Sequence, residues 1–132
     1  MNELQSIHFV DHQAKRSDPE RFLDVDVSVA AVVKSYRASL FSFEWLDGAG
    51  NIKAMAALPE KERPKREAVE AALKNGSALE KPVLGIGLQD NVEIGAGRAV
   101  FLTLAAMGMK RIPVHIPKSN QKDFKSFIAA LE

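Results

Sequence analysis

The sequence predicts an α+β fold in which a small mixed β-sheet is flanked by helices. Three neighbouring segments support this prediction: two short strands joined by a turn over residues 82–94, an apolar helix over residues 99–108, and a proline-containing strand over residues 111–117. The 132 residues are 46% hydrophobic and 27% charged, which are ordinary values for a globular protein. A chain of this length is most simply one domain, residues 1–132, with a core of its own.

The N-terminal part of the chain begins with polar residues and then becomes apolar. Residues 1–22 are mixed in character and show no clear helical or strand period. Residues 24–29 alternate valine with aspartate or serine, and this period of two predicts a strand with one buried face. Val32 and Val33 interrupt the alternation, so a helix is an open alternative from that point.

Residues 40–52 predict a further strand that runs into a turn. Asp47-Gly48 is a strong turn signal, because both residue types accept left-handed backbone conformations. Three aromatic side chains of this segment are expected on one face of the strand: Phe41, Phe43 and Trp45.

Two amphipathic helices are predicted outside the central segments. The first follows Pro64, covers residues 66–75 and has its natural stop at Gly76. The second covers residues 120–132, where apolar residues recur with helical spacing. Its inward-facing residues are expected to be Phe124, Phe127, Ile128 and Leu131.

The composition narrows the function classes. The chain has no cysteine, which excludes a disulfide framework, a thiolate zinc site and a cysteine nucleophile. A net charge of +1 gives no general attraction to nucleic acid or to an anionic membrane. The first residues contain no long apolar run, so neither a signal peptide nor a membrane span is predicted. The expected location is the cytoplasm, with no membrane partner.

Residues 92–108 contain the most specific motif, a short strand, a glycine turn and a helix. Gly95 and Gly97 would let backbone N–H groups face an anion at the helix N-terminus, and Arg98 adds a guanidinium suited to phosphate oxygens. A dinucleotide-binding turn is disfavoured, because Val100 stands where that motif requires a third glycine. Two interpretations stay open: a different phosphate-binding turn, or a tight structural turn with a solvated Arg98.

The order of elements over residues 58–117 resembles that of the ParB/sulfiredoxin-like superfamily: helix, strand, strand, glycine motif, helix, strand. The resemblance is closest to the branch of plasmid fertility-inhibition proteins, which are ParB-like nucleases with a Gly-Arg-His-Arg motif. The residues that fall into this register are Gly97, Arg98, Phe101, Gly108 and Ile112-Pro113-Val114. The resemblance implies a ParB/sulfiredoxin-like fold and, in active members, nuclease or nucleotide hydrolase activity.

The chain departs from the family at the two motif positions that carry chemistry. Ala99 and Val100 stand at the histidine and the second arginine, and neither side chain can donate a hydrogen bond or move a proton. A second register aligns Gly95–Arg98 with Gly-x-x-Arg, at the cost of a helix two residues longer than usual. The motif is therefore degenerate, no catalytic residue is assigned, and the candidate cofactor-binding residues are Gly95, Gly97 and Arg98.

Three functions follow from these observations. The favoured one is a regulatory or inhibitory interaction module with a protein partner, which the resemblance places on a plasmid or another mobile element. The alternative is an active ParB-like nuclease or nucleotide hydrolase that binds DNA, or ATP or CTP with magnesium, through the Gly95–Arg98 turn. The third is an oligomerising structural protein.

The histidines carry weaker signals. His8 and His12 have a spacing that suits a metal ion only on a helix, and no helical period surrounds them, so no metal site is predicted. His115 alternates with Val114 and Ile116 and is expected at the surface or rim of the sheet, not as a catalytic base.

Overall fold

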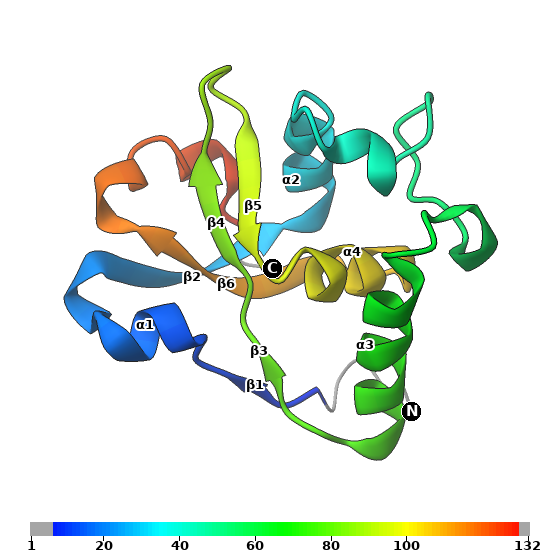
Figure 1. The fold of residues 1–132 in the computed structure, drawn as a ribbon. Helices are drawn as coiled ribbons and strands as arrows, with labels where there is room; N and C mark the ends of the chain where they lie inside the picture. Colours follow the sequence, from blue (N-terminus) through cyan, green and yellow to red (C-terminus); the bar gives the residue numbers. More distant parts are fainter. Residues whose placement is uncertain (1–6, 130–132) are drawn as a thin grey trace.

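The computed structural model describes residues 7–129, which form a mixed α+β structure (Figure 1). The strands are β1 (Phe9–Val10), β2 (Phe22–Ser28), β3 (Leu79–Glu80), β4 (Val83–Ile86), β5 (Val92–Ala96) and β6 (Arg111–Pro117). The α-helices within the described residues are α1 (Gln13–Ser17), α2 (Val29–Tyr36), α3 (Arg63–Asn75) and α4 (Arg98–Ala106).

The main sheet has four strands in the order β2-β6-β4-β5. β2 runs antiparallel to β6 from Phe22 opposite Pro117 to Ser28 opposite Arg111. β4 is parallel to β6 and forms an antiparallel hairpin with β5, and a separate parallel pair joins β1 to β3. The sheet is therefore mixed, as predicted, and its strand order places β6 between β2 from the N-terminal part of the chain and β4.

The core lies on one face of this sheet. In β6 the side chains of Ile112, Val114 and Ile116 are buried on that face, as the alternation of a strand requires. Helices α2 and α4 pack over it, and Phe101 and Leu104 of α4 are completely buried. Within residues 7–129, no helix is long and apolar enough to cross a membrane.

Most of the predicted elements are confirmed. The alternating valines form β2, the helix left open after them is α2, and residues 82–94 form the β4–β5 hairpin. The helix after Pro64 begins at Arg63 and ends at Gly76, which has the left-handed φ of 70° that favours glycine. The helix predicted over residues 99–108 is α4, and it is followed by β6 as expected.

The strand predicted over residues 40–52 is wrong. Residues Ser42–Glu44 form a 3-10 turn, in which the Ser42 hydroxyl donates to the carbonyl oxygen of Ser39 at 2.9 Å. These local hydrogen bonds replace a strand ladder, because serine side chains compete for backbone groups. The aromatic residues consequently separate: Trp45 is fully buried, whereas Phe41 and Phe43 are 61% and 65% exposed. The turn at Asp47-Gly48 is confirmed.

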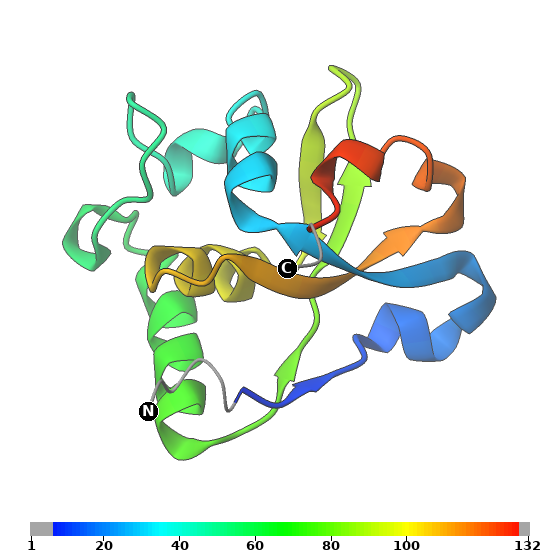
Figure 2. The same cartoon turned by 180° about the vertical axis from the view of Figure 1, so that it is seen from behind.

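The helix predicted over residues 120–132 is also wrong within the described part. Two 3-10 turns, Lys118–Asn120 and Lys125–Phe127, lead into an extended Ile128 that pairs with Val27 on the outer edge of β2. The N–H of Ala129 donates to the carbonyl oxygen of Asp26 at 2.9 Å, so the edge strand takes backbone partners that a helix could not supply. Figure 2 shows this segment, in red, beside β2 and α2. Leu131 lies outside the described residues.

Candidate functional site

The predicted glycine motif forms the junction between β5 and α4. Gly97 is the N-cap of α4 and has a φ of 78°, and a Cβ at this position would lie 2.9 Å from Cα of Pro82. Both the backbone conformation and the space therefore require glycine here. Gly95 lies inside β5, where a Cβ would be 3.5 Å from the carbonyl oxygen of Val83, an ordinary contact.

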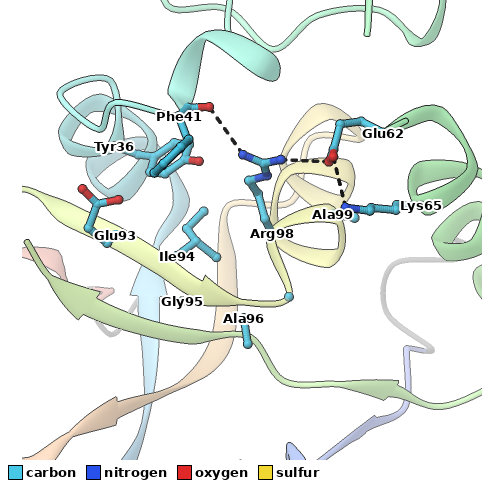
Figure 3. A pocket seen from close by; sticks show the side chains of 11 residues that line it. Tyr36, Phe41, Glu62, Lys65, Glu93, Ile94, Gly95, Ala96, Arg98 and Ala99 are labelled. Atoms are coloured by element: carbon cyan, nitrogen blue, oxygen red, sulfur yellow. Dashed lines mark hydrogen bonds and ion pairs between the residues drawn. The ribbon is translucent and has the colours of Figure 1, made fainter. Parts of the chain in front are cut away.

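The N-terminus of α4 opens into a pocket of about 460 Å³ (Figure 3). The first intrahelical bond runs from the N–H of Phe101 to the carbonyl oxygen of Gly97, so the preceding N–H groups have no partner inside the helix. Among residues 7–129, no side chain caps this end. The predicted turn therefore keeps the backbone donors and the helix dipole that attract an anion.

Arg98 is not free to bind a phosphate. Its Nη2 donates to Oε1 of Glu44 at 2.7 Å and to Oε1 of Glu62 at 2.9 Å. Burial alone would lower the pKa of Arg98, but hydrogen bonds with Tyr36 and the two carboxylates raise it above its ordinary value. The guanidinium is thus held as a cation between two acidic side chains from distant parts of the chain.

Glu62 is the central acceptor of this cluster. It precedes α3, its side chain is only 3% exposed, and it also accepts from Trp45 Nε1 and Lys65 Nζ, each at 3.0 Å. Burial alone would raise the pKa of Glu62, but these donors and Arg98 lower it to about 2. Glu62 therefore stays ionised at neutral pH and connects α3, α4 and the buried Trp45.

Glu44 is the second carboxylate that accepts a hydrogen bond from Arg98, and it also forms an ion pair with Lys61. Lys61 Nζ lies 2.9 Å from Oε2 of Glu44, while Arg98 occupies Oε1. The hydrogen bonds from Lys61 and Arg98 lower the pKa of Glu44 below its ordinary value. An anion entering the pocket would have to compete with two ionised carboxylates for Arg98.

Ala99 and Val100, which the sequence resemblance aligns with the histidine and the second arginine, have packing roles. Ala99 lines the pocket beside Arg98, and both Ala99 and Val100 pack against the buried core. Neither brings a proton donor, a base or a nucleophile to the pocket. The motif, as the structure arranges it, offers anion-attracting backbone and no group for covalent or acid–base chemistry.

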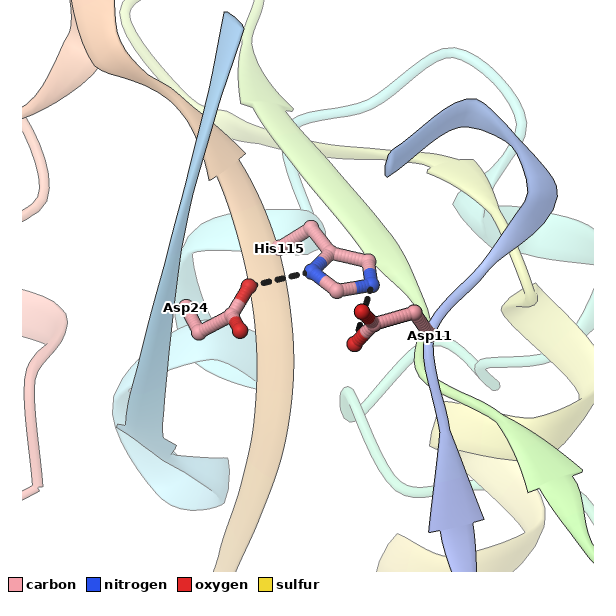
Figure 4. A group of neighbouring side chains, drawn as sticks. All are labelled: Asp11, Asp24 and His115. Atoms are coloured by element: carbon pink, nitrogen blue, oxygen red, sulfur yellow. Dashed lines mark hydrogen bonds and ion pairs between the residues drawn. The ribbon is translucent and has the colours of Figure 1, made fainter. Parts of the chain in front are cut away.

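A second cluster joins the N-terminal segment to the other face of the sheet (Figure 4). His115 was expected at the surface or rim of the sheet, and that prediction is wrong, because its ring is completely buried. Asp24 of β2 lies 2.6 Å from its Nδ1, and the N–H of His12 donates to its Nε2 at 3.1 Å. Since Nε2 accepts, Nδ1 carries the proton and donates to Asp24.

This cluster of His12, Asp24 and His115 ties the N-terminal segment to β2 and β6 through hydrogen bonds, and it is poorly suited to bind a metal ion. Asp11, Asp24 and His115 bring ligand atoms within 4.8 Å of one another, but both ring nitrogens are already engaged. Lys81 Nζ also lies 3.7 Å from each of the two carboxylates, which supplies the positive charge that a metal would bring. His8 and His12 do not share a helix, since His12 is the N-cap of α1.

Sequence reasoning located the turn and missed its partners. Gly97 and Arg98 stand where they were predicted, at the start of a helix. The acids that hold Arg98 come from residues 44 and 62, in a segment that was predicted as a strand and in a polar connection. No periodicity links these positions, so only the fold brings them together.

Comparison with known proteins identifies no relative of this chain. The chain matches no protein-family model, no curated protein and no solved structure.

Proposed function

We propose that the chain is a ParB/sulfiredoxin-like protein whose motif has lost its chemistry, and that it acts as a regulatory or inhibitory module by binding another protein. The observed order α3, β3, β4, β5, α4, β6 follows the order that the sequence resemblance implies, apart from the additional two-residue strand β3. A cytoplasmic location and a plasmid or mobile-element setting belong to the same proposal.

One observation supports this function above the others, the pairing of Arg98 with Glu44 and Glu62. Arg98 is the one motif cation that the sequence retains, and its charge is already met by two carboxylates. With Ala99 and Val100 in place of the histidine and second arginine, the two motif positions themselves supply no group that could activate water or a phosphate ester.

A second candidate function is supported by the open N-terminus of α4. Its first residues line a pocket of about 460 Å³ that is large enough for part of a nucleotide. In this alternative the chain binds DNA, or ATP or CTP with magnesium, and Gly95, Gly97 and Arg98 form the binding turn.

Calorimetry with ATP and with CTP, with and without Mg²⁺, separates the two functions. The interaction module predicts no binding and no hydrolysis by the wild type. Micromolar binding by the wild type would establish the nucleotide alternative instead. Its loss in an Arg98→Ala variant whose melting curve shows it to be folded, and not in the Lys74→Ala control on the exposed side of α3, would place the nucleotide at Arg98.

The protein-binding function needs a positive test as well. A photoreactive amino acid at Phe43 should capture one protein in cells, and the same group at Glu67 on α3 should not. The captured protein must then form a stoichiometric complex with the purified chain. Failure of the purified pair to associate would count against the proposed function.

A further inference from the structure

Four large apolar side chains project into solvent from two neighbouring segments. Leu40 is 84% exposed, Phe41 and Phe43 are more than half exposed, and Leu88 at the tip of the β4–β5 hairpin is fully exposed. Leu40 and Leu88 line one hollow of about 350 Å³, the Leu40–Leu88 hollow, so the two segments adjoin. Exposed apolar groups gathered in this way are typical of interaction surfaces.

The floor of this hollow carries an uncompensated carboxylate. Glu93 of β5 lines both the Leu40–Leu88 hollow and the pocket beside α4. Its oxygens accept from the Ser39 hydroxyl at 2.7 Å and from Asn91 Nδ2 at 2.9 Å, which are neutral donors. Within residues 7–129 no cation pairs with Glu93, and Figure 3 shows it across the pocket from Glu62 and Lys65.

A second acceptor in the same hollow is unsatisfied. Asn91 is buried, and its amide nitrogen donates to the carbonyl oxygen of Val92 and to Glu93, which fixes the orientation of the amide. Its Oδ1 has no hydrogen-bond partner in the described part of the chain. The Asn91 side chain therefore fixes the Glu93 carboxylate, while its own oxygen is buried away from an incoming side chain.

The hairpin is shaped to keep Glu93 in this position. A Cβ at Gly87 would lie 2.8 Å from Cγ of Glu93, so only glycine leaves room for the carboxylate to lie across the hairpin. Ser39 then holds the carboxylate from the opposite segment. The negative charge is therefore placed by three local features and does not swing freely in solvent.

We propose that the Leu40–Leu88 hollow is the docking site for a protein partner that inserts an arginine or lysine side chain against Glu93. The alkyl stem of that side chain packs on Leu40 and Leu88, and Phe41 covers the neighbouring apolar surface of the partner. This inference rests on the proposed protein-binding function and specifies its surface and the chemistry of its partner.

Charge favours a protein over a lipid surface as the occupant. Glu93 and the exposed Asp90 at the hairpin tip place negative charge beside the apolar side chains. Anionic membranes attract apolar patches that are flanked by basic residues, and they repel this arrangement. A partner segment with apolar and basic side chains satisfies both the exposed apolar area and the unpaired carboxylate.

A random 12-residue peptide library, displayed on phage and selected on the purified chain, supplies the probe. We expect enrichment of sequences that combine apolar residues with arginine or lysine. The affinity of a selected peptide should fall about tenfold or more in Glu93→Gln and in Leu88→Ser, because a charge-assisted hydrogen bond and the apolar contact are lost. Glu67→Gln and Met107→Ser are the matched controls and should bind as the wild type does.

A double-mutant cycle ties the basic side chain to Glu93. Replacing the arginine or lysine of the peptide by alanine should weaken binding to the wild type, but should add little further loss to the Glu93→Gln variant. Independent, additive losses would overturn the proposed pairing. Melting curves verify that each variant is folded. If Glu93→Gln is unstable, Leu88→Ser alone tests the surface, because Leu88 is fully exposed and its replacement should not affect folding.

Two other occupants are tested directly and would also overturn the proposal. Sedimentation equilibrium would show dimers that dissociate in Leu88→Ser if the hollow binds a second copy of the chain. Vesicles of phosphatidylcholine and phosphatidylglycerol would bind the wild type if it docks on lipid. Peptides that bind Leu88→Ser as well as the wild type would refute the Leu40–Leu88 hollow as the docking site, but not the protein-binding function. Nucleotide binding at Arg98 would refute the protein-binding function itself.

Discussion

Arg98 and Glu62 form an ion pair of 2.9 Å that connects the first residue of α4 to the residue before α3. The pair is largely buried, and Glu62 also holds the indole of Trp45. An arginine for which the sequence left phosphate binding open thus pairs with an acid at the start of another helix. Removing it has consequences for stability that must be separated from any effect on binding.

Arg98→Ala should destabilise the fold by about 2 kcal/mol, because Glu44 and Glu62 lose the cation that they share and keep only the exposed lysines Lys61 and Lys65. Urea unfolding at pH 7 measures the change. Lys74→Ala, in the exposed last turn of α3, is the control and should change little. An unchanged unfolding midpoint in Arg98→Ala would mean that the ion pairs do not hold the helices together.

Stability should fall in acid through Glu62. Its pKa is lowered in the folded chain from an ordinary 4.5 to about 2, so its stabilising contribution is complete above pH 4.5 and is lost as the pH falls toward 2. The shift corresponds to roughly 3 kcal/mol. Unfolding of wild type and Glu62→Gln between pH 7 and pH 2 measures it: the difference between them should shrink in acid. A constant difference would contradict this account.

Gly97→Ala should destabilise the chain by at least about 1–2 kcal/mol, because it combines a positive φ with a close approach to Pro82. Gly95→Ala is the matched substitution two residues earlier, where the added methyl group meets only an ordinary contact. Thermal melts of the two variants compare them. Equal losses would show that the turn does not depend on the left-handed conformation at position 97.

His115→Ala should release the N-terminal segment from the sheet. The variant removes the acceptor of the His12 N–H and the donor to Asp24, which is worth about 2 kcal/mol for groups of this kind. Amide hydrogen exchange over residues 8–17 should become faster while β4 and β5 keep their protection. An equal increase of exchange across the chain would mean that His115 stabilises the whole core and not only the attachment of the N-terminal segment.

The sequence predicted elements wherever local pattern and local structure agree. The alternating valines of β2, the hairpin with its turn at residues 89–91, and the glycine stops of α3 and α4 all depend on neighbours in the chain. Ser42 and Ile128 show where this fails. Around Ser42 the alternating aromatic residues predicted a strand, but hydroxyl hydrogen bonds stabilise a 3-10 turn there. Ile128 was predicted in a helix, but it is extended and pairs with the edge of β2.

The site was predictable only in its backbone. A glycine before a helix predicts that the first N–H groups of the helix are not capped by a side chain, and Gly97 confirms this at the start of α4. Whether Arg98 is free depends on Glu44 and Glu62, which lie 54 and 36 residues away. The burial of His115 likewise depends on His12, 103 residues earlier. Charge balance between such distant residues leaves no periodic trace in a single sequence.

The pairing of β2 has a consequence for the order of assembly. Both neighbours of this strand come from far along the chain, β6 at Arg111–Pro117 on one side and Ile128 on the other. β2 is thus synthesised well before either partner exists, and its valine-rich face and open edge are exposed to other nascent chains in the interval. Contacts of such long sequence separation slow folding. Protection by chaperones during translation would matter most for this strand, and substitutions that weaken the pairing at Ile128 should first appear as a loss of soluble yield.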